Sequence, residues 1–173
     1  VLSSNSPRFY LSKTAKIESV DLDTRFIISE SHDAHIFDLK DGYQKVTVKF
    51  NYSISLPKSN DYAVINESSG RVDWSGSSTN AFLPGGRLWY PFFNRPSTAH
   101  LTIKTIVGLR AIAPGLPIAY TERDGYAITT LDVTRPILGL DLMIGQWQVQ
   151  QKFMSGRKEK ILLQTYFDKA NAG

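Results

Sequence analysis

LWYPFFNRPSTAHLTIK, residues 88–104, places a proline-interrupted aromatic cluster directly before a strand of strict alternation. In that strand Leu101 and Ile103 alternate with His100, Thr102 and Lys104. A period of two is the spacing at which side chains line one face of a half-buried β-strand. A partner phrase, GLDLMIGQW at residues 139–147, combines apolar residues with two glycines. Together the two segments indicate a β-domain.

The same period of two recurs on both sides of this stretch. Its longest run alternates apolar with polar side chains from Val46 to Ile54, and Pro57 ends it. Asp41-Gly42 and Asp124-Gly125 are typical of tight turns between strands. Residues 58–80 resemble a long loop with a short hairpin at 70–74, and Arg135-Pro136 predicts a break in the chain. We expect strands at residues 8–11, 16–22, 25–28, 34–39, 46–54, 81–83, 98–105, 109–113, 118–121, 126–133, 140–144, 146–153 and 158–167.

These patterns predict an all-β fold class. No segment develops the 3.6-residue apolar period of a helix, because Gly, Pro and β-branched residues recur too often. Many short strands with frequent turns favour a saddle-like β-sandwich whose strands pair mostly antiparallel. The length of 173 residues suits one domain, so we expect a single β-domain over residues 1–173. Because the chain starts at Val1, we expect a mature form or an excised piece of a longer protein.

Composition excludes several classes of function. The chain has no cysteine, which excludes disulfides, thiolate zinc sites and a cysteine nucleophile. The formal net charge is +4, and the one basic cluster, Arg157, Lys158 and Lys160, is interrupted by Glu159, as in a solvated hairpin tip. We therefore expect no nucleic-acid partner. No apolar run approaches the ~20 residues of a membrane helix, so we expect no membrane span in this segment.

Candidate metal ligands are few. His32 and His35 have the only metal-like spacing, but residues three apart on a strand point to opposite faces, so we expect two exposed turn histidines. His100 falls on the polar face of its strand and is expected at the surface. The sequence contains no His-Glu-x-x-His motif. We expect no metal ligand in this chain.

Other catalytic patterns are equally weak. No serine lies in the Gly-x-Ser-x-Gly frame of a nucleophile elbow, and Pro84-Gly85-Gly86 does not open a phosphate-binding helix. Isolated carboxylates such as Glu18, Asp21, Asp73 and Asp132 offer no evident glycosidase pair. We therefore expect no catalytic and no cofactor-binding residue here.

The aromatic residues allow more than one interpretation. They would suit a sugar platform or a partner groove, but packing between sheets and against a neighbouring domain is the commoner role of such side chains. The residues concerned are Trp74, Trp89, Tyr90, Phe92, Phe93 and Trp147.

In order and spacing, these segments resemble the N-terminal β-domain of the aminopeptidase N family of zinc metallopeptidases, in a divergent bacterial branch. In that family a loop ends in Pro, a small or aromatic pair, Asp, Glu and Pro, and a strand follows. Here the loop ends in Pro91-Phe92-Phe93-Asn94-Arg95-Pro96, before Leu101-Thr102-Ile103. Later family elements match Pro114-Gly115 and the spacing of Leu142, Gly145 and Trp147. The opening strands fit as well, so the likeness spans nearly all of the chain.

The resemblance implies a non-catalytic domain that forms one wall of a substrate cleft and docks on a catalytic domain. It implies that zinc and the catalytic residues belong to that domain, downstream in the same polypeptide, and that peptide is the parent's substrate. The family's Thr-Gln-x-[Gln/Glu] loop, whose last residue helps hold the substrate's amine, corresponds to Thr79-Asn80-Ala81-Phe82. The resemblance thus implies Asn80 and Phe82 as cleft-rim residues.

Two departures from the family pattern keep alternatives open. Phe82 replaces a polar residue, and a phenyl ring cannot accept a charge-assisted hydrogen bond from an ammonium group. Asn94 and Arg95 replace the usual acidic pair. The parent therefore recognises substrate differently, or the chain is a scaffold or adaptor domain of a catalytically inactive relative. A stand-alone β-sandwich module that binds carbohydrate or peptide is a further alternative.

The resemblance leaves the compartment open. Divergent branches of the family include exported and membrane-associated bacterial forms, which makes an exported or periplasmic location one expectation. The absence of cysteine does not decide between compartments.

Overall fold

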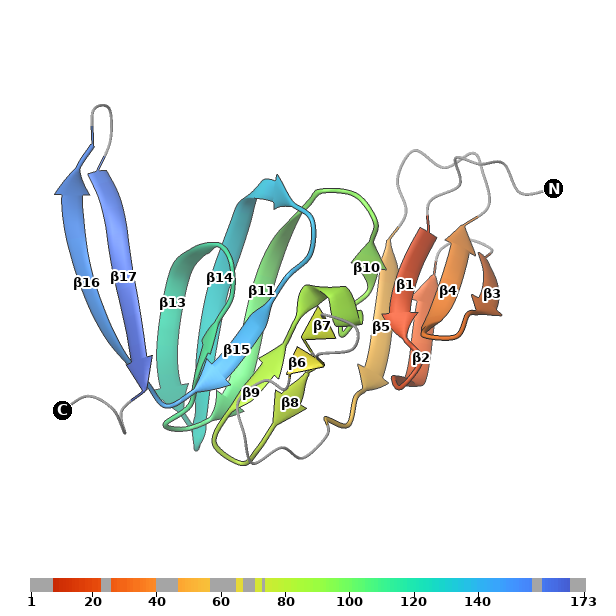
Figure 1. The fold of residues 1–173 in the computed structure, drawn as a ribbon, viewed down its shortest axis with the longest axis horizontal. Coiled ribbons are helices and arrows are strands. Elements are labelled where there is room, and N and C mark those ends of the chain that lie inside the picture. Colours follow the sequence, from red (N-terminus) through yellow and green to blue (C-terminus); the bar gives the residue numbers. More distant parts are fainter. Residues whose placement is uncertain are drawn as a thin grey trace.

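A computed structural model describes residues 8–22, 26–39, 47–56, 65–66, 71–72, 74–156 and 160–168. Its elements, shown in Figure 1, are β1 Arg8–Ser12, β2 Lys16–Leu22, β3 Phe26–Glu30, β4 Ala34–Leu39, β5 Val48–Ser53, β6 Ile65–Asn66, β7 Arg71–Val72, β8 Ser75–Gly76, β9 Ala81–Leu83, the 3₁₀ turn η1 Gly85–Arg87, β10 Phe92–Phe93, β11 Ser97–Ile106, β12 Arg110–Ile112, β13 Leu116–Arg123, β14 Tyr126–Ile137, β15 Leu142–Gly145, β16 Trp147–Ser155 and β17 Lys160–Asp168.

The predicted fold class is confirmed. The structure is an all-β, sandwich-like arrangement, with no α-helix among the described residues. Every strand pairing in the described part of the chain is antiparallel. Among the described residues, no helix is long and apolar enough to cross a membrane.

The N-terminal part consists of the sheet β10-β1-β4-β3 and the pair β2-β5, at one end of the long axis in Figure 1. Its core is centred on Leu11 and Phe37, both fully buried. Phe50 from β5 meets Phe37 edge-on, with ring centroids 4.9 Å apart. The alternation that predicted β5 therefore presents Phe50 and Tyr52 to this core, while Asn51 faces outward.

The middle of the molecule contains the sheets β11-β14-β13 and β12-β15-β9-β8, and Figure 1 shows the second in front of the first. On β14, every second residue from 127 to 133 is buried (Ala127, Thr129, Leu131 and Val133), as a strand with one covered face requires. Leu140 and Leu142 are also buried. The pair β16-β17 forms a ribbon that extends beyond the middle sheets, at the opposite end of the molecule from β1 (Figure 1).

Two local predictions were wrong. Arg135-Pro136 does not break the chain, because β14 continues to Ile137. The ladder with β11 is irregular there: Val133 pairs with Ala99 and Ile137 with Ser97, which leaves Pro136 out of the regular register. A bulge of this kind needs no ladder hydrogen bond from the proline nitrogen. The strand expected to end at residue 28 is longer, since β3 continues through Ser29 to Glu30.

The loop predicted at residues 58–80 lies only partly within the described residues. A short hairpin is present, with Ile65 opposite Val72 and Asn66 opposite Arg71, slightly earlier in the chain than expected. The Asp41-Gly42 turn and residues 157–159, which include the basic Arg157 and Lys158, lie outside the described residues.

Candidate functional site

An apolar hollow lies over the β9-β15 pair, and we call it the β9-β15 hollow. Phe82 in β9 pairs with Met143 on one side and with Ser75 on the other. Directly opposed residues of antiparallel strands share a face of the sheet, so this register places Phe82 beside Met143. The hollow measures about 210 Å³ and is lined by Ser75, Asn80, Ala81, Phe82, Met143, Ile144 and Trp147.

Asn80 lies at the rim of the β9-β15 hollow, where the turn before β9 ends. The Ser77 N–H donates to the Asn80 carbonyl at 2.8 Å. The Ser77 hydroxyl oxygen accepts hydrogen bonds from the N–H groups of Thr79 and Asn80, at 3.1 and 3.2 Å. A serine that binds nearby backbone amides in this way stabilises a turn. The turn thus holds the exposed Asn80 at the mouth of the hollow.

No lining residue of the β9-β15 hollow is ionisable. The polar side chains in the lining are those of Ser75 and Asn80, because the indole N–H of Trp147 is buried. Phe82 is half-buried and faces this uncharged surface. The hollow can therefore accommodate an apolar group next to a neutral hydrogen-bonding group, and it offers no carboxylate to an ammonium ion.

Trp147 closes one side of the β9-β15 hollow. Its ring packs against Gly145, where a β-carbon would stand 2.8 Å from ring atoms Cε2 and Cζ2. The buried Nε1–H has no acceptor among the described residues. Buried donors without a partner are uncommon in folded proteins, because the lost bond to water is not replaced.

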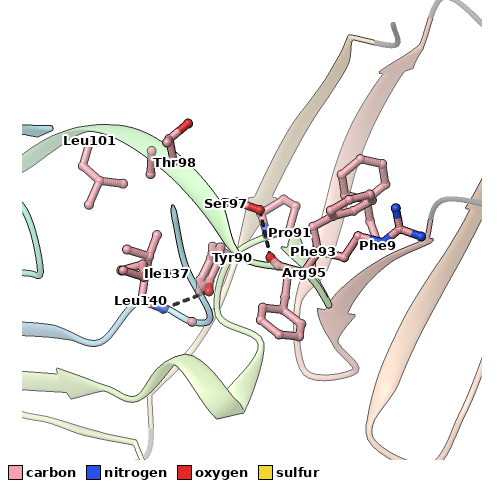
Figure 2. Close-up of a pocket in the computed structure, with 13 residues that line it drawn as sticks. Phe9, Tyr90, Pro91, Phe93, Arg95, Ser97, Thr98, Leu101, Ile137 and Leu140 are labelled. Atoms are coloured by element: carbon pink, nitrogen blue, oxygen red, sulfur yellow. Dashed lines mark hydrogen bonds between the residues drawn. The ribbon is translucent and has the colours of Figure 1, made fainter. Parts of the chain in front are cut away.

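A second, larger hollow of about 400 Å³ lies between the N-terminal sheet and the start of β11, as Figure 2 shows. Phe9, Phe93 and Arg95 border it on one side, and Leu101 and Ile137 on the other. Most of its remaining lining is also apolar, from Tyr90, Pro91, Phe92, Ser97, Thr98, Ala99, Gly139 and Leu140. We call it the aromatic hollow.

Trp89 and Tyr90, next to this hollow, are joined by hydrogen bonds to Leu140 and to Tyr52 of β5. The Trp89 Nε1–H donates to the Leu140 carbonyl at 2.9 Å, and the Leu140 N–H donates to the Tyr90 hydroxyl oxygen at 2.9 Å. The Tyr52 hydroxyl in β5 donates to the Trp89 carbonyl at 2.9 Å. These bonds give Trp89 and Tyr90 a structural role in holding the sheets together, as expected of inter-sheet aromatics.

Burial affects the acidity of the two tyrosines in this network. It raises the pKa of the Tyr52 hydroxyl above its ordinary value, because the phenolate would lose solvation. Burial also raises the pKa of Tyr90, although the hydrogen bond from the Leu140 N–H lowers it in part. Both hydroxyls therefore remain protonated at neutral pH and act as structural groups.

Each of the three histidines has its own acidic neighbour. His32 is almost fully exposed, as expected. His35 lies in β4 with a side chain only 15% exposed, and its Nδ1 is 3.3 Å from Glu30 Oε1, so the expectation of an exposed turn residue was wrong for it. His100 is exposed and contacts Asp132 across the β11-β14 pair. In the described part of the chain, no group of three or more His, Asp or Glu could hold a metal ion.

Among the candidate carboxylates, Glu18 and Asp21 belong to β2, whereas Asp132 belongs to β14. The Asp132 carboxylate contacts His100. The side chains of Glu18 and Asp21 are both exposed. Asp73 lies outside the described residues.

Two further residues, Met143 and Ile144, line the β9-β15 hollow beside Asn80 and Phe82. Asn80 and Phe82 line one hollow together, whereas Asn94 and Arg95 lie elsewhere, with the Arg95 guanidinium 5.9 Å from the Phe93 ring centroid. Met143 and Ile144 were not predicted as lining residues. Their place depends on the pairing of β15 with β9, which local periodicity does not reveal.

The amino-acid sequence matches no protein-family model and no curated protein. The fold, in contrast, matches solved structures. A variant of a two-domain M1 zinc metallopeptidase bound to L-tryptophan is 16% identical, with a TM-score of 0.72 over 97% of this chain and 42% of that chain. The M1 zinc metallopeptidase from Deinococcus radiodurans is 14% identical, with a TM-score of 0.69 over 95% of this chain and 41% of that one.

A third match is aminopeptidase A from Legionella pneumophila in complex with aspartic acid. It is 14% identical, with a TM-score of 0.70 over 99% of this chain and 21% of that chain. This chain therefore has the fold of one part of M1 zinc metallopeptidases, and it spans less than half the length of each of these three proteins. The family resemblance drawn from the sequence motifs is thus confirmed at the level of the fold.

Proposed function

We propose that this chain is the non-catalytic N-terminal domain of a zinc aminopeptidase-like protein. In this role it forms one wall of the substrate cleft and docks on a catalytic domain that follows in the same polypeptide. The observation that carries the proposal is the shared fold, which covers nearly all of this chain but only 42% of a two-domain zinc metallopeptidase. Zinc, the reactive groups and the peptide-cleaving step belong to the remainder of the parent protein.

The β9-β15 hollow supports the assignment of the cleft wall. Asn80 and Phe82, assigned to the rim by motif, meet in this hollow beside Met143 and Trp147. A cleft wall of this composition positions a peptide through apolar contact and the Asn80 amide. Binding in a fixed orientation is a contribution to catalysis that requires no reactive group on the wall itself.

The aromatic hollow supports the assignment of a docking face. It is open and mainly apolar, and it is bordered by residues that the Trp89 and Tyr90 hydrogen bonds hold in place. A preformed apolar surface gains affinity when another domain removes it from water, because little order has to be created at binding.

Phe82 favours a second candidate function. The β9-β15 hollow contains no carboxylate, so a free peptide amine finds no ionic partner among its described lining residues. A domain without this carboxylate, in a protein that also lacks zinc ligands, would serve as a scaffold or adaptor. The presence or absence of zinc ligands in the parent sequence beyond Gly173 distinguishes the two functions.

The test begins with the parent reading frame beyond Gly173. The zinc-peptidase proposal predicts His-Glu-x-x-His and a later Glu there, together with zinc-dependent hydrolysis of aminoacyl-arylamides or peptides by the whole protein. Absence of these ligands from a downstream domain of the same fold family would contradict the peptidase and favour the scaffold.

A matched pair of variants of the whole protein tests the cleft wall. Phe82→Ala removes an apolar contact from the hollow and is expected to change kcat/KM by about ten-fold or more. Ile106→Ala removes a side chain that is 56% exposed at the end of β11, outside the lining of the hollow, and is expected to leave kcat/KM unchanged. Equal kinetics for both variants would remove Phe82 from the cleft.

A further inference from the structure

The end of the β16-β17 ribbon exposes apolar side chains on both strands. Phe153 and Met154 in β16 are 64% and 49% exposed, and Ile161 and Leu163 in β17 are 51% and 46% exposed. We call these four residues, with Leu162, the ribbon tip. The tip differs from the inner part of the ribbon, where Gln148 and Gln150 are exposed and Val149 is half-buried in the usual alternation.

The register of the ribbon places these side chains on both of its faces. Phe153 pairs with Leu162, and Met154 pairs with Ile161. Paired residues share a face and successive residues alternate between faces, so the first pair projects from one side and the second from the other. Both faces of the tip are therefore apolar, which is the pattern of strands that are covered on both sides.

No other described strand pairs with the ribbon. In the described part of the chain β16 pairs only with β17, and β17 only with β16. A two-stranded hairpin in water is at best marginally stable by itself. A cluster of exposed apolar side chains at its end marks an interaction surface, because soluble proteins rarely leave such clusters in contact with water.

We propose that the ribbon tip inserts into the polypeptide that follows Gly173 and is covered by it on both faces. The inference rests on the proposed function, which places a further domain there. It assigns to that domain an apolar slot that takes Phe153 and Leu162 on one side, and Met154 and Ile161 on the other. The ribbon thereby becomes a docking element separate from the aromatic hollow, whose lining includes residues of β1 and β10. Figure 1 shows the ribbon at the opposite end of the molecule from β1.

The choice of occupant rests on two observations. First, β17 ends at Asp168, which pairs with Trp147 at the base of the ribbon, so a downstream domain of the proposed parent would be joined to this chain through the ribbon. A tethered segment has a high effective concentration and outcompetes a free partner of similar affinity. Second, the matching metallopeptidases are more than twice as long as the part of them that this chain covers. A second copy of this chain that added to one face would leave the other face of the tip in water.

Hydrogen exchange measured on two proteins tests the inference: residues 1–173 alone and the parent chain continued through its next domain. We expect amides of β16 and β17 near the tip to exchange at least about ten-fold more slowly in the longer protein. In the longer protein the double variant Met154→Ser with Ile161→Ser is expected to lose that protection. The matched control, Gln150→Ser with Thr165→Ser, alters a directly opposed pair on the same face and is expected to keep it.

The outcomes separate this inference from the proposed function. Zinc-dependent activity of the longer protein, with tip exchange as fast as in residues 1–173, would overturn the ribbon inference alone. A protected tip in a longer protein without zinc ligands would support the ribbon inference and overturn the peptidase. Protection in residues 1–173 alone that rises with concentration, together with a dimer in sedimentation, would assign the tip to a second copy and overturn the inference.

Discussion

The indole ring of Trp147 packs so closely on Gly145 that a β-carbon there would stand 2.8 Å from the ring atoms Cε2 and Cζ2. Gly145 is the last residue of β15 and pairs with Arg110 of β12. Trp147 starts β16 and lines the β9-β15 hollow. Gly145 therefore takes part in the β12-β15 pairing and also sets the position of a ring that lines the proposed cleft wall.

Gly145→Ala is expected to displace the Trp147 ring, because the two cannot occupy the present positions together. Overpacking of this kind costs about 1–3 kcal/mol of the free energy of unfolding. The displacement should also shift the fluorescence emission of Trp147, isolated in a background where Trp74 and Trp89 are replaced by Phe. An unchanged emission spectrum and unchanged stability would show that the ring is not held by Gly145.

Gly85→Ala and Gly86→Ala form a pair of adjacent substitutions with opposite expectations. A β-carbon on Gly85 would lie 2.7 Å from the Leu140 backbone nitrogen, whereas one on Gly86 meets nothing within 4 Å. The Gly85 N–H also donates to Asp141 Oδ1 at 2.7 Å, so the contact cannot widen without weakening that bond. We expect Gly85→Ala to lower the free energy of unfolding by about 2 kcal/mol or more, and Gly86→Ala to leave it nearly unchanged. Urea denaturation of both variants measures the difference, and equal midpoints would contradict it.

Tyr52→Phe tests the hydrogen bond between β5 and the Trp89 carbonyl. Removing the hydroxyl should cost about 1 kcal/mol at neutral pH. Because burial raises the folded-state pKa of Tyr52 above its unfolded value of about 10, its contribution is present below pH ~10 and lost as the pH rises through the folded pKa. The free energy of unfolding should therefore fall less steeply above pH ~10 in the variant than in the wild type. Parallel curves from denaturant titrations across that pH range would contradict a buried Tyr52 hydroxyl.

Residues 1–173 alone are expected to hydrolyse no aminoacyl-arylamide, with or without added zinc. The described residues include no group of three or more His, Asp or Glu close enough to bind a metal ion. Addition of a chelator should likewise leave the thermal unfolding midpoint of this chain unchanged. Zinc-dependent turnover by the pure chain would assign catalysis to it and contradict the proposal that catalysis belongs to a downstream domain.

Local patterns predicted most of the strands. The expected ranges 16–22, 34–39 and 81–83 agree with β2, β4 and β9 at both ends. Alternation suffices for this purpose because the side chains of a half-covered strand must alternate wherever the strand lies in the sheet. The same local rules failed at Pro136, where an irregular pairing with β11 accommodates a residue that would end a regular strand.

The sequence by itself determined the all-β class, the positions of most strands and the motif order that relates the chain to zinc metallopeptidases. It also singled out Asn80 and Phe82. Only the tertiary structure decided that Met143 lies opposite Phe82, that Trp147 rests on Gly145, and that the tip of the ribbon is apolar on both faces. The physical reason is that the register between strands is set by how sheets pack on one another and by turn geometry. Residues far apart in the chain meet through that packing, and no period along the chain encodes it.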